Sequence, residues 1–353
     1  MRVLVTGGAG FVGANLALRL RRDHEWSVTA LDNLKRRGSE LALRRLAQGG
    51  VCFVHGDVRS PDDLNAVDAV DIIIECSAEP SVHAGSDGDA RYVVETNLMG
   101  TFNCLELARR HGAGMIFLST SRVYSIAALR ALPLVPAATR LIPAAGASGC
   151  GWSPQGIAET FPTTGNRSLY GATKLSSELL VEEYHAIHRI PTVIDRCGVI
   201  SGPWQMGKVD QGFFVLWAAR HLYGGPLAYS GFGGEGLQVR DVLHVDDLYG
   251  LVEHQVMRIE SLAGRTFNVG GGAGSSVSLR EFTALCAERT GRNIAVGSNS
   301  VTRSEDIPYY VSDNRLVRQL TNWSPRYTVE GILDDVIAWL DEYRKELIPI
   351  LGQ

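Results

Sequence analysis

The chain has 353 residues, of which 45% are hydrophobic and 20% charged, and its formal net charge is −4. This predicts one large or two modest domains with a substantial core and excludes a disordered chain. No long basic run is present, which argues against a nucleic-acid partner, and no apolar run reaches the ~18 residues that a membrane span needs. The six cysteines have no metal-ligand spacing and no signal peptide is visible, so we expect reduced thiols, no metal and a cytoplasmic protein.

The first predicted strand, residues 2–6, leads into a glycine-rich turn. Gly7, Gly10 and Gly13 follow it with the spacing G-x-x-G-x-x-G, and a helical pattern covers residues 14–22. This order is typical of dinucleotide binding, because the glycines let the backbone approach a pyrophosphate and the helix N-terminus stabilises its charge. The alternative is a tight turn without a ligand.

The next predicted strand, residues 26–31, ends on Asp32, which lies 19 positions after Gly13. An acid at this position can hydrogen-bond both hydroxyls of a ribose and would repel a 2′-phosphate, which favours NAD over NADP. Lys35 and Arg36 keep the second cofactor open, because they could receive a 2′-phosphate.

Strands and helices continue to alternate as far as about residue 200. Strands are predicted at 51–54, 71–76, 115–119 and 191–196, with helices from Pro61 and over 91–111 and 169–188. The alternation predicts an α/β fold, a Rossmann-type doubly wound parallel sheet, whose ligands bind beyond the carboxyl ends of the strands. Those ends carry small or polar residues, namely Gly7, Asp32, Asp57, 77–79 and 119–121.

We expect residues 1–200 to form the cofactor domain, with a long insert at 125–165 that is rich in Ala, Pro and Gly. A structureless loop of this length is usually functional or flexible, so it either covers the substrate or packs on the surface of its own domain. Residues 201–353 are expected mainly to form a smaller mixed α/β substrate lobe, with some segments returning to the first domain. Its helices are predicted near 209–222, 245–259, 279–290 and 329–345.

Tyr170 and Lys174 are four residues apart in a predicted helix, which places both on one face. A Lys ammonium beside a phenol favours the phenolate, so the pKa of Tyr170 should fall and the phenol could act as a general base. The spacing alone also fits an ordinary pair on a helix surface.

Together these motifs resemble the extended short-chain dehydrogenase/reductases, and among them the NAD-dependent nucleotide-sugar epimerase/dehydratase family. The resemblance covers nearly the whole chain in order. The matching stretches are 6–13, 32–34, 57–58, 97–101, 119–124, 170–174, 240–245 and 268–270. Within the family the likeness is closest to the CDP-paratose 2-epimerases, on the stretches 32–39, 120–125, 210–212, 238–244, 303–306 and 312–313.

The resemblance implies that Tyr170 is the acid/base, that Thr120 hydrogen-bonds the reacting hydroxyl and that Lys174 holds the nicotinamide ribose. The cofactor, a tightly bound and recycled NAD, is expected at Gly7, Gly10, Phe11, Val12, Gly13, Asp32, Asn33, Asp57, Val58, Ser77, Ala78, Asn97, Ser119, Tyr170, Lys174 and Cys197. The substrate, a nucleotide-diphosphate sugar with a CDP-sugar favoured, is expected at Glu79, Ser81, Thr120, Ser121, Arg122, Gln211, Arg240 and Arg303.

Arg240 and Arg303 are chosen for the diphosphate because a guanidinium offers a bidentate fork. The family pattern around the second is Arg-x-Gly-Asp, and Glu305 here replaces the glycine, which puts the shape of that loop in doubt.

The implied reaction is an epimerisation, in which a sugar carbinol is oxidised, the keto-sugar turns and the hydride returns to the other face. In the CDP-paratose 2-epimerases it is carbon 2 that inverts. The dehydratases of the family carry an Asp-Glu pair directly after the Thr, whereas Ser121 and Arg122 stand there in this chain, so dehydration is disfavoured.

Three alternatives remain open. They are a UDP-hexose type 4-epimerase, an NAD(P)-dependent sugar-nucleotide dehydrogenase or reductase, and a dinucleotide sensor, which would have no need to retain Thr120, Tyr170 and Lys174. The resemblance also implies a homodimer or dimer-based tetramer built on the helices at 94–111 and 169–188. Ordinary core packing fits the apolar residues of those helices nearly as well.

Overall fold

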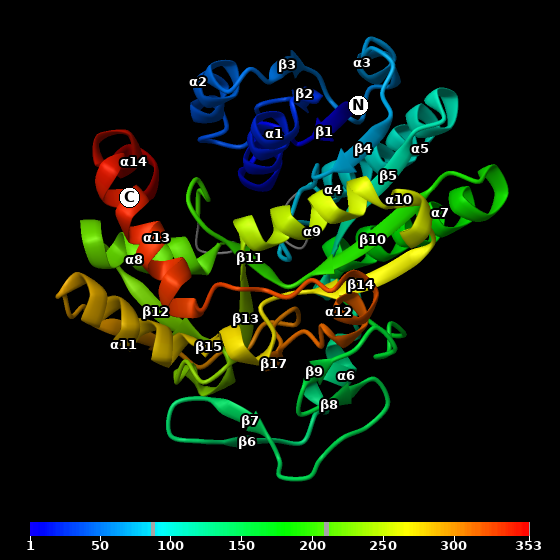
Figure 1. Cartoon of the computed structure of the whole chain (residues 1–353). Helices are drawn as coiled ribbons and strands as arrows, with labels where there is room; N and C mark the ends of the chain where they lie inside the picture. The colour runs from blue at the N-terminus through cyan, green and yellow to red at the C-terminus, as the bar shows by residue number, and fades with distance from the viewer. Residues whose placement is uncertain (86–88, 208–211, 353) are drawn as a thin grey trace.

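The centre of the fold is a seven-stranded parallel sheet with the order β14–β10–β5–β4–β1–β2–β3. A computed structural model describes residues 1–85, 89–207 and 212–352 (Figure 1). The strands are β1 (Arg2–Thr6), β2 (Ser27–Asp32), β3 (Cys52–His55), β4 (Ile72–Glu75), β5 (Gly114–Thr120), β10 (Thr192–Cys197) and β14 (Arg265–Val269). The order reverses between β1 and β4, which is where ligands bind in doubly wound sheets. The predicted fold class is confirmed.

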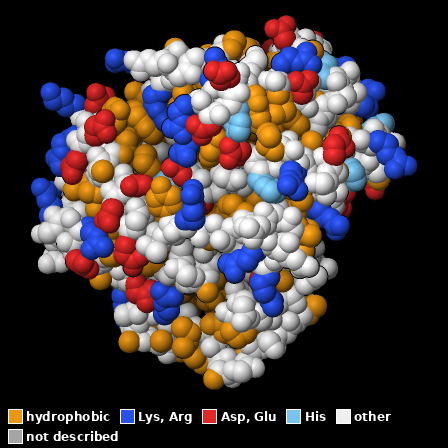
Figure 2. Space-filling view, viewed as in Figure 1, with side chains coloured by type: hydrophobic (Ala, Val, Ile, Leu, Met, Phe, Trp, Pro, Cys, Tyr) orange, Lys and Arg blue, Asp and Glu red, His pale blue; other side chains and the backbone are white. Residues whose placement is uncertain are grey.

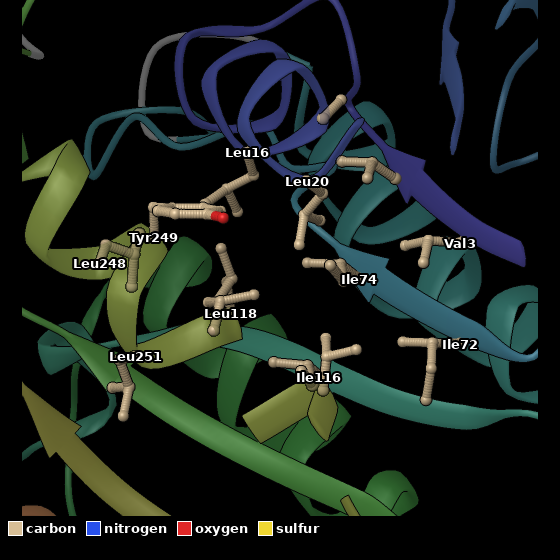
Figure 3. Packing of buried hydrophobic residues seen from close by; sticks show 14 of the residues in the cluster. Val3, Leu16, Leu20, Ile72, Ile74, Ile116, Leu118, Leu248, Tyr249 and Leu251 are labelled. Atoms are coloured by element: carbon tan, nitrogen blue, oxygen red, sulfur yellow. The ribbon is translucent and has the colours of Figure 1, made fainter. Parts of the chain in front are cut away.

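The strands are apolar on both faces because helices cover both sides of the sheet. Val3 and Val5 pack into one hydrophobic cluster, whereas Leu4 between them packs into another on the opposite face. Figure 3 shows the first cluster, where Leu16 and Leu20 of one helix and Leu248 of another approach the sheet. The helices on this face are α1 (Phe11–His24), α2 (Glu40–Gln48), α9 (Val245–Met257), α10 (Ile259–Leu262) and α12 (Arg315–Thr321).

The second face is covered by α3 (Pro61–Asn65), α5 (Gly100–His111) and α7 (Ser168–His188). The single helix predicted at 91–111 is wrong in one respect, because it consists of three parts. They are α4 (Ala90–Val94), a π-helical turn η1 (Glu95–Met99), and α5. The wide turn carries Asn97, whose carbonyl accepts bonds from the hydroxyls of Thr101 and Ser177. Two side-chain donors thus satisfy a carbonyl that a regular helix would use itself, and π turns of this kind often mark functional sites.

The C-terminal part adds a four-stranded mixed sheet and a helical layer. The mixed sheet holds β11 (Val199–Ser201), β13 (Val239–His244), β15 (Ser276–Ser278) and β17 (Tyr309–Tyr310), and a separate pair holds β12 (Leu227–Ser230) and β16 (Val296–Asn299). The helices are α8 (Phe213–Tyr223), α11 (Leu279–Thr290), α13 (Val329–Glu342) and α14 (Arg344–Leu351), which share one hydrophobic cluster. A domain boundary near residue 200 stays a prediction.

The insert at 125–165 is folded rather than structureless. It contains α6 (Ile126–Arg130) and two hairpins, β6 (Leu134–Pro136) with β7 (Leu141–Pro143), and β8 (Trp152–Ser153) with β9 (Gly156–Ile157). The backbone N–H of Ile157 donates to Val311 at 2.7 Å, and Arg140 pairs with Glu281 at 2.5 Å, so the insert packs on the C-terminal part of the chain. Hydrophobic side chains gather at the end of the molecule where the β6–β7 hairpin lies (Figure 2), and Val135 and Ile142 are exposed there.

Short 3-10 turns complete the chain, at η2 (Ser121–Val123), η3 (Phe232–Gly234) and η4 (Ala273–Ser275). No helix in the described ranges combines the length and the apolar character that a membrane crossing requires.

Candidate functional site

The glycine turn between β1 and α1 brings backbone so close to backbone that no side chain would fit. Gly7 has φ +62°, and a Cβ there would lie 2.9 Å from the carbonyl of Cys76. A Cβ on Gly13 would lie 2.2 Å from the carbonyl oxygen of Gly7. No side chain caps the start of α1, so the N–H groups of its first turn remain for a ligand. This cradle fits the pyrophosphate of a dinucleotide.

A cavity of about 590 Å³ opens beside this turn at the carboxyl edge of the sheet. Most of the residues predicted for the cofactor line it, namely Gly7, Gly10, Phe11, Val12, Gly13, Asp32, Asn33, Val58, Ser77 and Ala78, and Glu79 lines it as well. The sequence interpretation missed a second wall made by Trp204, Gln205 and Met206, which belongs to the C-terminal part and carries no motif.

Asp32 and Asp57 lie at the ends of β2 and β3 and are both held by neighbours. The carboxylate of Asp32 accepts the N–H groups of Leu34 at 2.7 Å and Ala9 at 3.1 Å, while burial raises its pKa. Asp57 accepts from Asn33 at 2.9 Å. Although burial opposes it, hydrogen bonds from Arg59 and Asn33 bring the pKa of Asp57 down to about 2, so that carboxyl is ionised.

Lys35 and Arg36, the two basic side chains that could receive the 2′-phosphate of NADP, both contact other groups of the protein. Lys35 places its Nζ 3.0 Å from the ring centroid of Tyr92, and Arg36 donates to the carbonyl of Met206 at 2.8 Å. Both also line the cavity.

Asn97 supports the cavity wall through hydrogen bonds to Glu79, which lines the cavity. Its side-chain oxygen accepts the N–H of Glu79 at 2.8 Å, and its amide donates to the carbonyl of Glu79 at 3.1 Å and to Thr173 at 3.2 Å. Asn97 is fully buried. Its side chain therefore fixes the loop after β4 against α7, rather than being open to a ligand.

Thr120 and Tyr170 are brought together, as predicted, at the end of β5 and the start of α7. The Thr120 hydroxyl hydrogen-bonds the Tyr170 phenol, and Cys197 lies beside Thr120 in the strand register. Burial raises the pKa of Tyr170 to about 12, with the bond from Thr120 and the charge of Arg122 acting in the opposite direction. The expected fall of this pKa is therefore wrong for the protein alone, because burial outweighs the nearby charge.

Lys174 lies one turn further along α7 and is buried. Its Nζ is 3.9 Å from the ring centroid of Phe117, and it interacts electrostatically with Glu75 at the end of β4. Burial raises the pKa of Glu75 to about 7, although Lys174 and a 2.7 Å bond from Thr101 favour the ionised form. Lys174 thus lies between the apolar ring of Phe117 and the carboxyl of Glu75.

A buried network continues the same face of α7. Ser119 donates to Glu178, which pairs with Arg196 at 2.7 Å. Arg196 donates to the Tyr124 hydroxyl at 3.3 Å, and that hydroxyl donates to Asn268 at 2.7 Å. Ser119 is thus engaged with protein groups. Glu178 was missed, yet the signal was present, since it extends the four-residue spacing of Tyr170 and Lys174 by one more turn.

Three arginines hold one segment, residues 303–307, by its backbone carbonyls. Arg130 donates to residues 303, 304 and 306, Arg122 donates to Glu305 at 3.0 Å, and Arg240 donates to Ile307 at 2.7 Å. We call residues 303–307 with Arg122, Arg130 and Arg240 the arginine wall. Burial and the charge of Arg122 lower the pKa of Arg240 to about 9.

The other residues predicted for the substrate lie around this wall. Arg303 is exposed, with its backbone N–H on Asp306 at 2.9 Å. Ser81 and Ser121 are buried, and His83, next to Ser81 in the same loop, lies 3.8 Å from Glu305. Gln211 falls outside the described residues. In the described part of the chain, no group of His, Cys, Asp and Glu is arranged to hold a metal.

The fold and this site define an NAD-dependent enzyme of the Rossmann type with a Thr–Tyr–Lys cluster at the carboxyl edge of its sheet. Residues 3–270 match the NAD dependent epimerase/dehydratase family, and the chain belongs to this family. It is therefore an enzyme of the sugar-nucleotide epimerase/dehydratase class with NAD as its cofactor.

Similar proteins within this class catalyse different reactions. The chain is 28% identical to the CDP-paratose 2-epimerase of Salmonella typhi, over 96% of this chain and 99% of that one. It is 30% identical to a dTDP-glucose 4,6-dehydratase of Streptomyces griseus, over 99% of this chain and 97% of the other. Its fold is similar to that of the UDP-glucuronic acid 4-epimerase of Bacillus cereus, solved with UDP-glucuronic acid and NAD (TM-score 0.80, 23% identity, 97% and 99% covered).

Proposed function

We propose that this protein is a nucleotide-sugar epimerase that retains its NAD, and that its reaction is the 2-epimerisation of CDP-paratose to CDP-tyvelose or a close analogue. The observation that carries the choice of epimerase is the pair Ser121-Arg122 directly after Thr120. Neither side chain can protonate a departing hydroxyl, because a guanidinium stays charged and a serine hydroxyl is a weak acid. The likeness to a CDP-paratose 2-epimerase supports the choice of substrate.

The chain's own groups have separate roles in this proposal. Bound NAD supplies a reversible hydride acceptor for the sugar carbinol. Tyr170 takes the hydroxyl proton from that carbinol and later returns it, and Thr120 orients the hydroxyl from the adjacent strand end. Lys174 holds the nicotinamide ribose, and a cationic nicotinamide nearby would lower the pKa of Tyr170 toward neutrality.

Binding is assigned to the two sides of the site. The glycine turn holds the pyrophosphate of NAD, Asp32 holds the adenosine ribose, and the loop at Ser77 and Ala78 faces the cofactor. The arginine wall receives the nucleotide diphosphate, because Arg122 and Arg240 donate to carbonyls, which leaves their charges for an anionic ligand. Glu79, Ser81 and Ser121 are assigned to the sugar.

The experiment uses purified protein with CDP-paratose and no added nicotinamide. We expect CDP-tyvelose to form without a lasting change in the absorbance of reduced nicotinamide, and NAD to be released when the protein is denatured. Turnover of a UDP-hexose at carbon 4, without turnover of CDP-paratose, would assign the protein to the 4-epimerases. Stoichiometric formation or consumption of reduced nicotinamide would make it a net dehydrogenase or reductase.

We also propose a homodimer built on α5 and α7. The two helices lie side by side, linked by a 2.6 Å bond from Tyr184 to Glu106, and α7 exposes Leu179 and Ile187. Burial of such side chains against a second copy is favourable. Sedimentation should show a dimer for the wild type and a shift toward monomer for Leu179→Glu.

A further inference from the structure

The cavity beside the glycine turn has walls from two distant parts of the chain. One wall is the loop after β2, residues 33–39, which follows Asp32 directly. The other comes from the C-terminal part and consists of residues 204–206 together with Ile350 of α14. Figure 1 shows α14, at the red end of the chain, on the same side of the molecule as α2. The contacts between these two walls therefore decide how the cavity is closed.

Two arginines of the loop donate to backbone carbonyls of the other wall. Arg36 donates to the carbonyl of Met206 at 2.8 Å, and Arg37 donates to the carbonyl of Pro349 in α14 at 2.6 Å. Both arginines and Met206 line the cavity themselves. Hydrogen bonds from a charged donor are stronger than those between neutral groups, so these two bonds tie the walls together at the cavity.

Close packing adds to the two bonds. Gly38 has φ +94°, and a Cβ there would lie 2.7 Å from Cγ of Met206, so the loop and the opposite wall are in direct contact. Arg45 of α2 places its guanidinium 4.1 Å from the ring centroid of Trp204. The Trp204 ring in turn lies 4.6 Å from that of Tyr343, the residue directly before α14. The first helix after the loop, the wall and α14 thus form one continuous set of contacts.

The position of α14 depends on contacts of this kind. The helix has eight residues and contains Pro349, which has no N–H to donate. A helix of this length is not stable on its own in water. Leu347 and Leu351 anchor it in the C-terminal hydrophobic cluster, Arg37 holds it from the loop, and Ile350 lines the cavity. It is therefore an element that can move away while the central sheet stays folded.

We propose that residues 204–206 and α14 form a clamp over bound NAD, and that Arg36 and Arg37 are the positioning residues that keep the clamp closed. The proposal rests on the proposed function in one respect, that NAD stays bound between turnovers. An epimerase must return the hydride that it has removed, so a cofactor that left between the two steps would stop the reaction. The clamp explains the retention, and it gives Arg36 a role other than binding a 2′-phosphate.

The test measures how fast NAD leaves and enters. Protein loaded with radiolabelled NAD is mixed with an excess of unlabelled NAD, and the label that remains bound is followed with time. Calorimetry on protein freed of NAD gives Kd, and koff divided by Kd gives the association rate constant. Arg36→Met should release NAD about three- to tenfold faster, the usual worth of one hydrogen bond. Arg37 is exposed, so water replaces part of its bond and Arg37→Met should have a smaller effect.

A clamp predicts that both rates change in the same direction. Its bonds join protein groups, so their loss eases the entry of NAD as well as its release. In the double variant Arg36→Met, Arg37→Met we expect release to be about 10- to 50-fold faster, association also to be faster, and Kd to change less than either rate. Hydrogen exchange of the amides at 344–351 should be faster than in wild type as well.

Two variants serve as controls. Lys35→Met removes a positive charge from the same cavity, but Lys35 lies over the ring of Tyr92 instead of on the C-terminal wall. It should slow association, because attraction for an anionic dinucleotide is lost. Arg21→Met removes an equivalent bond, to the carbonyl of Gly50 at 3.2 Å, and should leave both rates unchanged.

Unchanged rates in the double variant would overturn the clamp. So would faster release with unchanged or slower association, because that result would mean that the arginines only bind NAD directly. The measurement needs no sugar substrate. If wild type itself exchanges NAD within a single turnover, the retention in the proposed function is wrong, whereas the ratio of variant to wild-type rates still decides whether the clamp exists.

Discussion

The floor of the site and the arginine wall hold groups of opposite charge, buried carboxyls in the floor and half-buried or exposed guanidinium groups in the wall. The floor is the central sheet, which buries Glu75 on β4 and Asp195 on β10, and burial raises the pKa of each to about 7. On the substrate side, Arg122 and Arg240 are held by backbone carbonyls. A buried carboxyl can lose its charge by binding a proton, whereas a guanidinium cannot. The floor can therefore exist without a ligand charge, whereas the wall keeps its positive charge, in line with the anionic ligand that we propose for it.

Tyr170 lies between these two regions. Removal of its hydroxyl should therefore slow the chemical step without weakening the binding of NAD or of the nucleotide sugar. Tyr170→Phe should lower the turnover rate by about 10²- to 10⁴-fold, the usual contribution of a general acid/base. NAD content and nucleotide-sugar affinity, measured by release on denaturation and by calorimetry, should change little. Tyr223→Phe, which removes a hydroxyl on α8 that donates to the Leu340 carbonyl of α13, is the control. Activity within tenfold of wild type would show that another group is the base.

The cofactor side depends on close backbone contacts, and Gly13→Ala should damage that side alone. The added Cβ would lie 2.2 Å from the Gly7 carbonyl oxygen, so the turn must shift. We expect NAD affinity to fall about 10- to 100-fold, since overpacking of this kind costs about 1–3 kcal/mol. Calorimetry with NAD measures this. Gly250→Ala, in α9 with open space around it, should bind NAD normally, and a loss there equal to that of Gly13→Ala would contradict the argument.

The difference between the cofactor side and the arginine wall also explains which parts of the site could be predicted from the sequence. The glycine turn, Asp32 and the pair Tyr170 and Lys174 are local patterns, in which spacing along the chain sets geometry, and they led to the fold class and the cofactor. The arginine wall joins residues 122, 130 and 240 to the segment 303–307 through backbone carbonyls. Carbonyls belong to every residue, so no residue pattern marks where such bonds form.

Two misses have more specific causes. The π turn at Glu95–Met99 is set by side-chain hydroxyls that donate to the Asn97 carbonyl. Helix propensities describe single residues and do not include hydrogen bonds of this kind. The insert was expected to be structureless because it is rich in Ala, Pro and Gly. Its hairpins form on tertiary contacts with distant residues such as Leu237 and Val311, which is the general limit of reading strands from local sequence.

Asp195 offers a test of the floor through pH. Its side chain accepts from Gln255 at 2.8 Å, its second oxygen has no partner among the described residues, and its pKa is raised from 3.8 to about 7. A raised acid pKa means that the folded protein binds the proton more tightly, so stability falls as pH rises from about 4 to 7. Asp195→Asn should remove this loss of stability. At pH ~8 the variant should unfold at a higher denaturant concentration than wild type, with a free energy of unfolding larger by on the order of 2 kcal/mol. Near pH ~4 the two proteins should be similar. A gain of the same size at both pH values would indicate a packing effect instead.

The smallest effect is expected at the arginine wall, from Arg130→Met. Methionine keeps much of the side-chain volume but removes the bonds to the carbonyls of Arg303 and Asp306. Because Arg130 is exposed, water can replace part of what is lost, so we expect the segment to loosen rather than unfold. Substrate KM should rise about three- to tenfold, equivalent to roughly 1 kcal/mol, with kcat and NAD affinity nearly unchanged. If NAD affinity falls as much as substrate affinity, the two sides of the site are coupled, and the separation between floor and wall does not hold.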